Sequence, residues 1–220
     1  YYKTFKGKVL MNHSSESGIF KNILFSHLPN RKDNLSQIMI KLVFVITLLA
    51  MIISFVSVSH HFLVIKGETN LIEKNYELLG NEEPLTNRQI NAFLNINPDF
   101  RGYIKIGNTK INNPIYQANN NTFYKIHNSL KEKSVFGSLY FDCNNTITFK
   151  KIDKNLIVYG NKTENEQLFS QLEKYKNIKF YKQNPTIRLS TFYSNDTYVI
   201  YSVFIINSDA KDDGGYIYNY

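Results

Sequence analysis

The chain has 220 residues, of which 43% are hydrophobic, so it is long enough for one ordinary domain with a packed core plus accessory segments. Its 16 Tyr and 16 Phe favour β structure, and a single cysteine excludes an internal disulfide and a cysteine-based zinc site. The formal charge of +8 is concentrated before residue 42, and no nucleic-acid-binding motif accompanies it, which argues against a nucleic-acid partner.

The first predicted element is an apolar helix. Residues 42–59 (LVFVITLLAMIISFVSVS) carry no charge, and the run reaches Ile65 when His60 and His61 are tolerated. A helix needs this length to cross a bilayer, so we predict a transmembrane helix over residues 38–65. A buried core helix is the alternative, although such helices are rarely apolar on every side for so long. Lysine and arginine crowd the preceding segment, which predicts that residues 1–37 are cytoplasmic and the remainder extracellular.

A helical stalk is predicted over residues 66–95. GETNLIEKNYELLG (67–80) is helix-like, and EEP at residues 82–84 then interrupts it. The second helix begins with Thr86 as N-cap, with Gln89 returning the capping-box hydrogen bond and Leu85 packing against Ile90. We predict its end near residue 97, because a residue before proline avoids the α region.

From Phe100 onward the apolar residues alternate with a period of two, which is typical of strands. One helix is predicted at residues 164–175, with an apolar face, and one hairpin turn at residues 194–196. Many short strands with a single helix favour a mainly β fold, a closed or nearly closed β-barrel over residues 96–220. The strand-like runs are RGYIKI (101–106), KINNPIYQ (110–117), GSLYFD (137–142), LIVYG (156–160), TIRLSTFY (186–193) and TYVIYSVFII (197–206).

A series of motifs in a fixed order points to a family. They are INPDFRGYIKIGNTKINNPIYQ (96–117), FYKIHN (123–128), GSLYFDCNN (137–145) and NLIVYGNKTENEQLFSQLEKY (155–175). Together they resemble the class B sortases, which are membrane-anchored cysteine transpeptidases of Gram-positive bacteria. The family pattern there runs N-x-D-hydrophobic-G-W/Y-I-x-I, T-x-I-x-x-P-hydrophobic-x-Q, Y-L-x-H, G-S-I-F-x-D-x-R-N, and I-Y-G-H followed by M-F-x-x-L.

The resemblance implies an eight-stranded β-barrel that cuts a sorting signal near the C-terminus of a secreted protein and transfers it to an amine of the cell-wall precursor. The implied partners are that peptide, the peptidoglycan precursor and the lipid bilayer, with no cofactor. The family needs a His after Tyr-Gly, a Cys at the end of a later strand and an Arg on the next strand. A thiol of pKa about 8.5 is little ionised at neutral pH, so the imidazole supplies charge and a proton, and the Arg stabilises the oxyanion.

Carried over to this sequence, the catalytic triad is not intact. Asn161 occupies the His position in YGN (159–161), and an amide neither takes up nor releases a proton near neutral pH. No T-L-S-T-C strand occurs before Tyr220, so we expect a barrel that is incomplete at its C-terminus, as in a truncated gene product. Cys143 lies upstream of Tyr-Gly, whereas the family nucleophile lies downstream, and His127 matches a non-catalytic family histidine. We predict no intact catalytic residue and no metal site.

Three interpretations stay open. The chain is a class B sortase homologue that has lost catalysis, or a non-catalytic module that binds an extended peptide or a cell-wall fragment, or an unrelated single-pass protein with a structural β-domain. Peptide binding by the outer domain favours the second interpretation over the first, and a fold without a barrel favours the third. The second interpretation predicts peptide contacts from Tyr159, Asn120, Asn121 and Tyr124.

Overall fold

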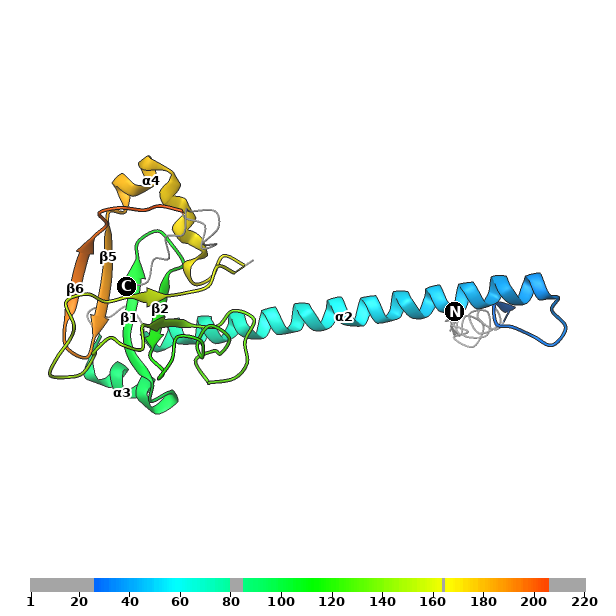
Figure 1. Cartoon of the computed structure of the whole chain (residues 1–220), viewed down its shortest axis with the longest axis horizontal. Coiled ribbons are helices and arrows are strands. Elements are labelled where there is room, and N and C mark those ends of the chain that lie inside the picture. Colours follow the sequence, from blue (N-terminus) through cyan, green and yellow to red (C-terminus); the bar gives the residue numbers. More distant parts are fainter. Residues whose placement is uncertain (1–25, 80–84, 164, 206–220) are drawn as a thin grey trace, which may run out of the picture. The chain divides into compact units, whose positions relative to one another are not determined.

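The computed structural model describes residues 26–79, 85–163 and 165–205. It divides into two compact units, Tyr1–Leu63 and Val64–Tyr220. Helix α2 (Leu35–Leu79) runs from the first unit into the second (Figure 1).

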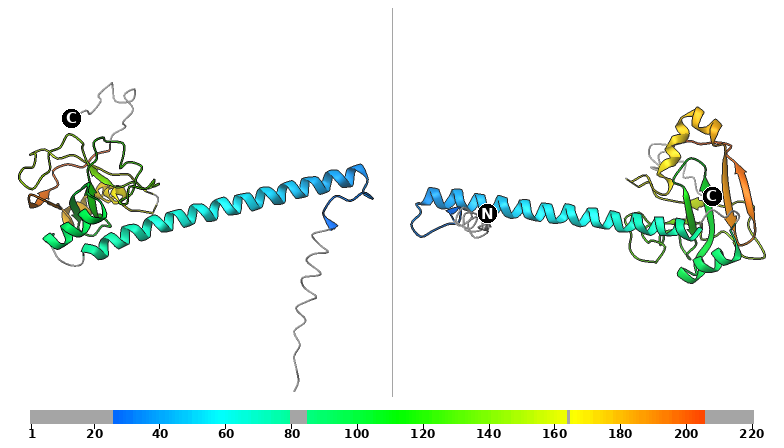
Figure 2. Two further views of the ribbon diagram at one scale, coloured as in Figure 1. Left: turned by 90° about the horizontal axis from the view of Figure 1, so that it is seen from below. Right: turned by 180° about the vertical axis from the view of Figure 1, so that it is seen from behind.

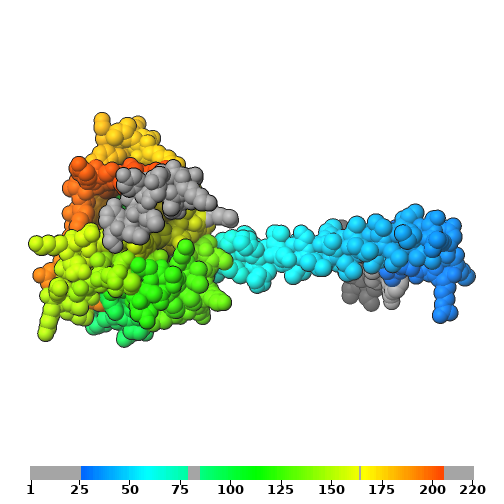
Figure 3. Space-filling view, viewed as in Figure 1, coloured from blue at the N-terminus to red at the C-terminus, as the bar shows by residue number. Residues whose placement is uncertain are grey.

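In the first unit, α2 is apolar and its side chains are exposed. The helix begins at reciprocal hydrogen bonds between Asn34 and Gln37, which satisfy backbone N–H groups that the first turn leaves free. Lys41 reaches back to Asp33, with 2.9 Å between Nζ and Oδ2. In the view of Figure 3 no other described element covers the middle of this part of the helix. By length and composition alone, α2 is able to cross a membrane.

In the second unit, α2 continues to Leu79 and is followed by α3 (Asn87–Ile96). The interruption predicted at residues 82–84 lies outside the described residues. The predicted start of α3 is confirmed: the Thr86 side chain accepts from the Gln89 backbone N–H, and the Gln89 side chain accepts from the Thr86 backbone N–H. The predicted end is confirmed as well, because Asn97 has extended backbone angles.

A six-stranded sheet forms the body of the second unit and curls into an open half-barrel (Figures 1 and 2). Its strand order is β4-β3-β2-β1-β5-β6, in which only β2 and β3 run parallel. Among the described residues β4 and β6 are the edges. The mainly β, barrel-like fold is therefore confirmed. The strands are β1 (Phe100–Ile106), β2 (Asn112–Tyr116), β3 (Leu139–Phe141), β4 (Val158–Tyr159), β5 (Thr186–Thr191) and β6 (Asn195–Val199).

The last strand and its turn differ from the prediction. The turn lies at residues 191–194, where the Thr191 backbone N–H donates to Ser194 O, so Asn195 already pairs with Ser190 in the ladder. The strand ends at Val199, earlier than predicted. Beyond it, the Ile200 backbone N–H donates to the carbonyl of Pro185, outside the β5–β6 ladder.

The single helix predicted at residues 164–175 is also wrong. A 3₁₀ helix, η1 (Phe169–Lys176), is followed by a short α4 (Ile178–Gln183). Glu166 and Leu168 have positive φ values of 61° and 49°, and an α-helix of L-residues does not pass through that region. The apolar face of the segment is nonetheless used, because Leu168, Phe169, Leu172 and Tyr175 all join the main core cluster.

Two apolar clusters hold the second unit together, one on each face of β1. Ile104 and Ile106 join the larger cluster, which also contains Ile72 of α2. Phe100 and Tyr103 join the smaller one, which α3 covers through Ile90 and Phe93. A largely apolar groove of about 470 Å³ lies between β1, β5, β6, η1 and residues 154–158.

Candidate catalytic and peptide-binding site

Asn161 follows β4 and fastens two parts of a neighbouring loop. Its Nδ2 donates to the carbonyl of Lys125 at 2.7 Å and to that of Phe136 at 2.9 Å. These two carbonyls stand near the two ends of the loop formed by residues 124–138. Within this loop the Ser138 backbone N–H donates to Tyr124 O at 2.9 Å. The amide therefore uses both of its N–H groups inside the protein.

Two glycines allow the segment around Asn161 and the 124–138 loop to pack this closely. Gly160 precedes Asn161, and a Cβ there would lie 2.6 Å from Cδ2 of Phe169 and would also overlap the Leu139 side chain. Gly137 has a φ of +68°, and a Cβ there would lie 2.5 Å from the carbonyl oxygen of Lys125. The glycine of the Tyr-Gly motif is therefore explained by packing, because any side chain at this position would overlap its neighbours.

Asp142, just after β3, is the centre of a polar network beside β4. Its carboxylate accepts from Tyr159 Oη at 2.9 Å and from Asn121 Nδ2 at 2.8 Å. The backbone N–H of Asn144 also donates to it and is the main reason why the pKa of Asp142 lies below its usual value. Burial, followed by the Asp142 carboxylate, raises the pKa of Tyr159.

The four predicted peptide contacts occupy different positions. Tyr159 is 36% exposed, and its ring lies tilted against that of Tyr140 with 5.2 Å between the centroids. The Asn121 side chain donates to Asp142, which also accepts from Tyr159. Asn120 lies in an exposed turn, where its Oδ1 accepts from the backbone N–H groups of residues 122 and 123. Tyr124 is fully buried, with its hydroxyl donating to Asp99 at 2.7 Å. A side chain without exposed surface cannot contact a bound peptide, so we correct the prediction by removing Tyr124.

Cys143 and His127 are both tied to local structure. The Cys143 backbone N–H donates to Asn121 Oδ1 at 2.8 Å, and the residue as a whole is half-buried. His127 stacks on Phe123 at 4.1 Å between ring centroids, and its Nδ1 lies 2.7 Å from the Phe123 carbonyl oxygen. Within the described ranges, no three His, Cys, Asp or Glu side chains gather in a group that suits a metal ion.

Sequence reasoning missed Asp142 as the hub of the site. The available signal was its position directly after β3, with Asn144 and Asn145 following Cys143, because short polar residues after a strand bond to nearby backbone. The role of the Lys125 and Phe136 carbonyls left no sequence signal, since every residue carries a carbonyl.

Comparison with known proteins agrees with this architecture. No family model matches the sequence. The chain is 33% identical to sortase B of Listeria monocytogenes over 114 residues, which is 52% of the chain and 46% of that protein. The chain also matches sortase B of Staphylococcus aureus over 62% of that protein's length. It therefore spans between about half and three fifths of the length of these two curated relatives.

Solved sortase B structures have the same fold. A mutant form of the Clostridium perfringens enzyme is 32% identical, with a TM-score of 0.56 over 64% of this chain and 67% of that one. The S. aureus sortase B–substrate complex is 26% identical, with a TM-score of 0.57 over 64% of this chain and 66% of that one. Because sequence and fold agree over the half-barrel, the chain belongs to the class B sortase family.

Proposed function

We propose that this chain is a membrane-attached class B sortase-like protein that does not perform the family's cleavage and transpeptidation. The observation that carries the proposal is the side chain of Asn161. By resemblance it stands where the family has its histidine, and it donates to the carbonyls of Lys125 and Phe136.

The chemistry explains why this substitution matters. The family reaction needs a group that stabilises a cysteine thiolate and then protonates the leaving amine. A carboxamide has no proton to exchange near neutral pH, and in this protein its N–H groups already have acceptors. Asn161 is thus suited to holding the 124–138 loop and not to moving protons.

We expect no turnover of sorting-signal peptides by the full chain in detergent. The measurement is mass-spectrometric detection of cleavage and of transfer to an added amine, with S. aureus sortase B as the active reference. Loss of general acid–base catalysis alone lowers a rate by about 10²- to 10⁴-fold. The matched control is the reference enzyme in which the histidine after Tyr-Gly is changed to asparagine. Its cleavage rate should fall by a similar factor. Cleavage by this chain that Cys143→Ala abolishes would overturn the proposal.

Peptide binding without cleavage is the second candidate function. It is favoured by the Tyr159 ring, which is partly exposed beside Asn161 while Asp142 holds its hydroxyl. A solved S. aureus sortase B structure is a complex with substrate, and the family resemblance implies a sorting-signal peptide as the ligand class. Binding of a labelled sorting-signal peptide should weaken by about tenfold in Tyr159→Ala, corresponding to about 1.4 kcal/mol. Tyr193→Ala, at an exposed turn of the same sheet, is the matched control.

We also propose that α2 anchors the protein in the membrane and that the β-domain, the part of the second unit that contains the six-stranded sheet, lies outside the cell. The apolar stretch of α2 and the basic residues that precede it support this orientation. Protease added to intact cells should remove the β-domain and leave an N-terminal fragment, and permeabilised cells provide the control. Full protection of the β-domain in intact cells would contradict this orientation.

A further inference from the structure

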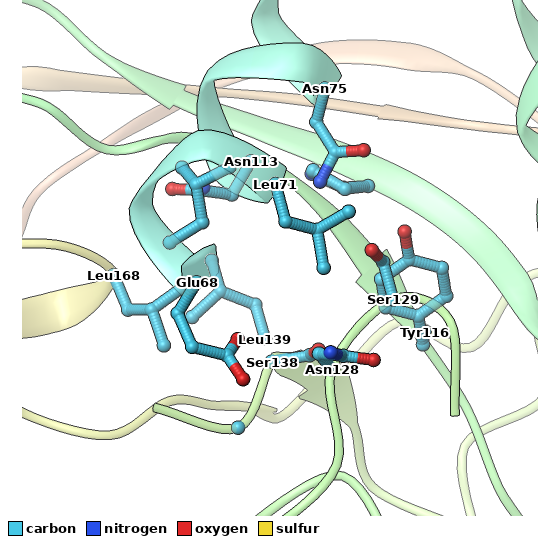
Figure 4. A pocket seen from close by; sticks show the side chains of 13 residues that line it. Glu68, Leu71, Asn75, Asn113, Tyr116, Asn128, Ser129, Ser138, Leu139 and Leu168 are labelled. Carbon is cyan, nitrogen blue, oxygen red and sulfur yellow. The ribbon is translucent and has the colours of Figure 1, made fainter. Parts of the chain in front are cut away.

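A small cavity lined by both polar and apolar side chains lies beneath the last turns of α2 in the second unit (Figure 4). It offers about 20 Å³ to the centre of a water-sized sphere, which is room for one water molecule. Glu68, Leu71 and Asn75 line it from α2. Tyr116 at the end of β2 and Asn128 and Ser129 in the 124–138 loop line it from the β-domain.

Polar side chains that are almost wholly buried converge on this cavity. Tyr116 and Ser129 are 1% and 4% exposed, and within the described ranges neither hydroxyl meets full hydrogen-bond geometry with a partner. Burial raises the pKa of Tyr116, and Ser129 lies near enough to lower that pKa against the effect of burial. Asn75 is 6% exposed, and its amide faces the same space in Figure 4. The hydroxyls of Tyr116 and Ser129 lie close together, but pairing them would use only one of their two O–H protons.

A buried hydroxyl without a partner costs free energy, so native proteins satisfy such groups, often with an internal water. We propose that this cavity is a site for one ordered water molecule that bridges Asn75 of α2 to Tyr116 and Ser129. A water fits because it both donates and accepts, as the two hydroxyls and the amide require. A bound cation would occupy acceptor lone pairs and leave the hydroxyl protons without acceptors.

The position of this site gives it a structural role. Ile72, one turn before Asn75, packs in the main core, and the backbone carbonyl of Ser129 accepts from Asn97 Nδ2 at 2.9 Å. The water would therefore join α2 to a loop position that is already fixed. The same 124–138 loop carries both carbonyls bound by Asn161. The site thus fastens the helix to the loop that supports the candidate catalytic position.

The sign of a stability change tests the proposal. In Tyr116→Phe the ring keeps its stacking on Tyr124, and only the hydroxyl is lost. If that hydroxyl is bound to water, the melting temperature of the full chain in detergent should fall by about 2 to 4 °C. If the hydroxyl has no partner, its removal relieves an unsatisfied group and the melting temperature should rise, which would overturn the proposal. Tyr175→Phe is the control: it removes a direct hydrogen bond to Asn184 O at 2.9 Å, so its melting temperature should fall.

Two further measurements identify the occupant. One water serves both hydroxyls, so removing either hydroxyl already weakens the bridge. The decrease in melting temperature of the double variant Tyr116→Phe/Ser129→Ala should therefore be smaller than the sum of the decreases in the two single variants. A crystal structure at high resolution should show one density peak within hydrogen-bonding distance of Asn75, Tyr116 and Ser129. A melting temperature that rises with sodium or ammonium chloride, but not with choline chloride at equal ionic strength, would assign the site to a cation and overturn the proposal.

Discussion

Replacing Asn161 with aspartate is expected to lower the free energy of unfolding by about 2 to 3 kcal/mol at pH 7. The Asn161 amide donates to the carbonyls of Lys125 and Phe136 at 2.7 and 2.9 Å. A carboxylate at this position removes both donors and places negative oxygens against two carbonyl oxygens. Urea-induced unfolding of the full chain in detergent measures the loss. Asn161→Ala is the matched control, because it removes the donors without adding charge.

The aspartate variant should regain stability in acid. Repulsion from the two carbonyls raises the folded-state pKa of the new carboxyl above its unfolded value of about 3.9. Such a group favours folding below the unfolded pKa, and this contribution is lost as the pH rises through the folded pKa. Between pH 3 and 7 the stability of Asn161→Asp should therefore fall relative to that of Asn161→Ala. Parallel pH profiles for the two variants would show that Asn161 does not face these carbonyls.

Gly137→Ala is expected to be the most damaging small substitution in the second unit, with a loss of about 3 to 5 kcal/mol. The residue has a φ of +68°, which an alanine adopts only with strain. The added Cβ would also meet the carbonyl oxygens of Lys125 and Tyr124 at 2.5 and 2.6 Å. Those oxygens belong to the backbone and accept hydrogen bonds from Asn161 and Ser138, so they cannot move without breaking the loop.

Gly107→Ala is the matched control for this effect. Its nearest neighbour would be Asn184 Oδ1 at 3.4 Å, an ordinary contact, and the position is exposed with no positive φ. A change within about 0.5 kcal/mol is expected there. Equal unfolding midpoints in urea for the two alanine variants would mean that the loop adopts another conformation near Gly137.

The elements predicted correctly are those whose signals are local. The capping box needs only Thr86 and Gln89, three residues apart, and β1 and β5 follow from alternation within six or seven residues. The elements predicted wrongly depend on pairings that their residue types do not specify. The turn between β5 and β6 closes through the Thr191–Ser194 hydrogen bond, so that Asn195 pairs with Ser190, and β6 ends at Val199, just before the Ile200 N–H that donates to the carbonyl of Pro185.

Three features could be read from the residues alone: the amide at position 161, the apolar run of bilayer length before the sheet, and the motif order of the class B sortases. Other features required the packed chain: the acceptors of the two Asn161 N–H groups, the burial of Tyr124 in the core, and the hydrogen bonds from Tyr159 and Asn121 to Asp142. It alone placed Asn75, Tyr116 and Ser129 around one cavity, from positions up to 54 residues apart. The reason is physical: residue type sets which bonds a side chain can make, but the partners come from distant segments that only the packed chain brings together.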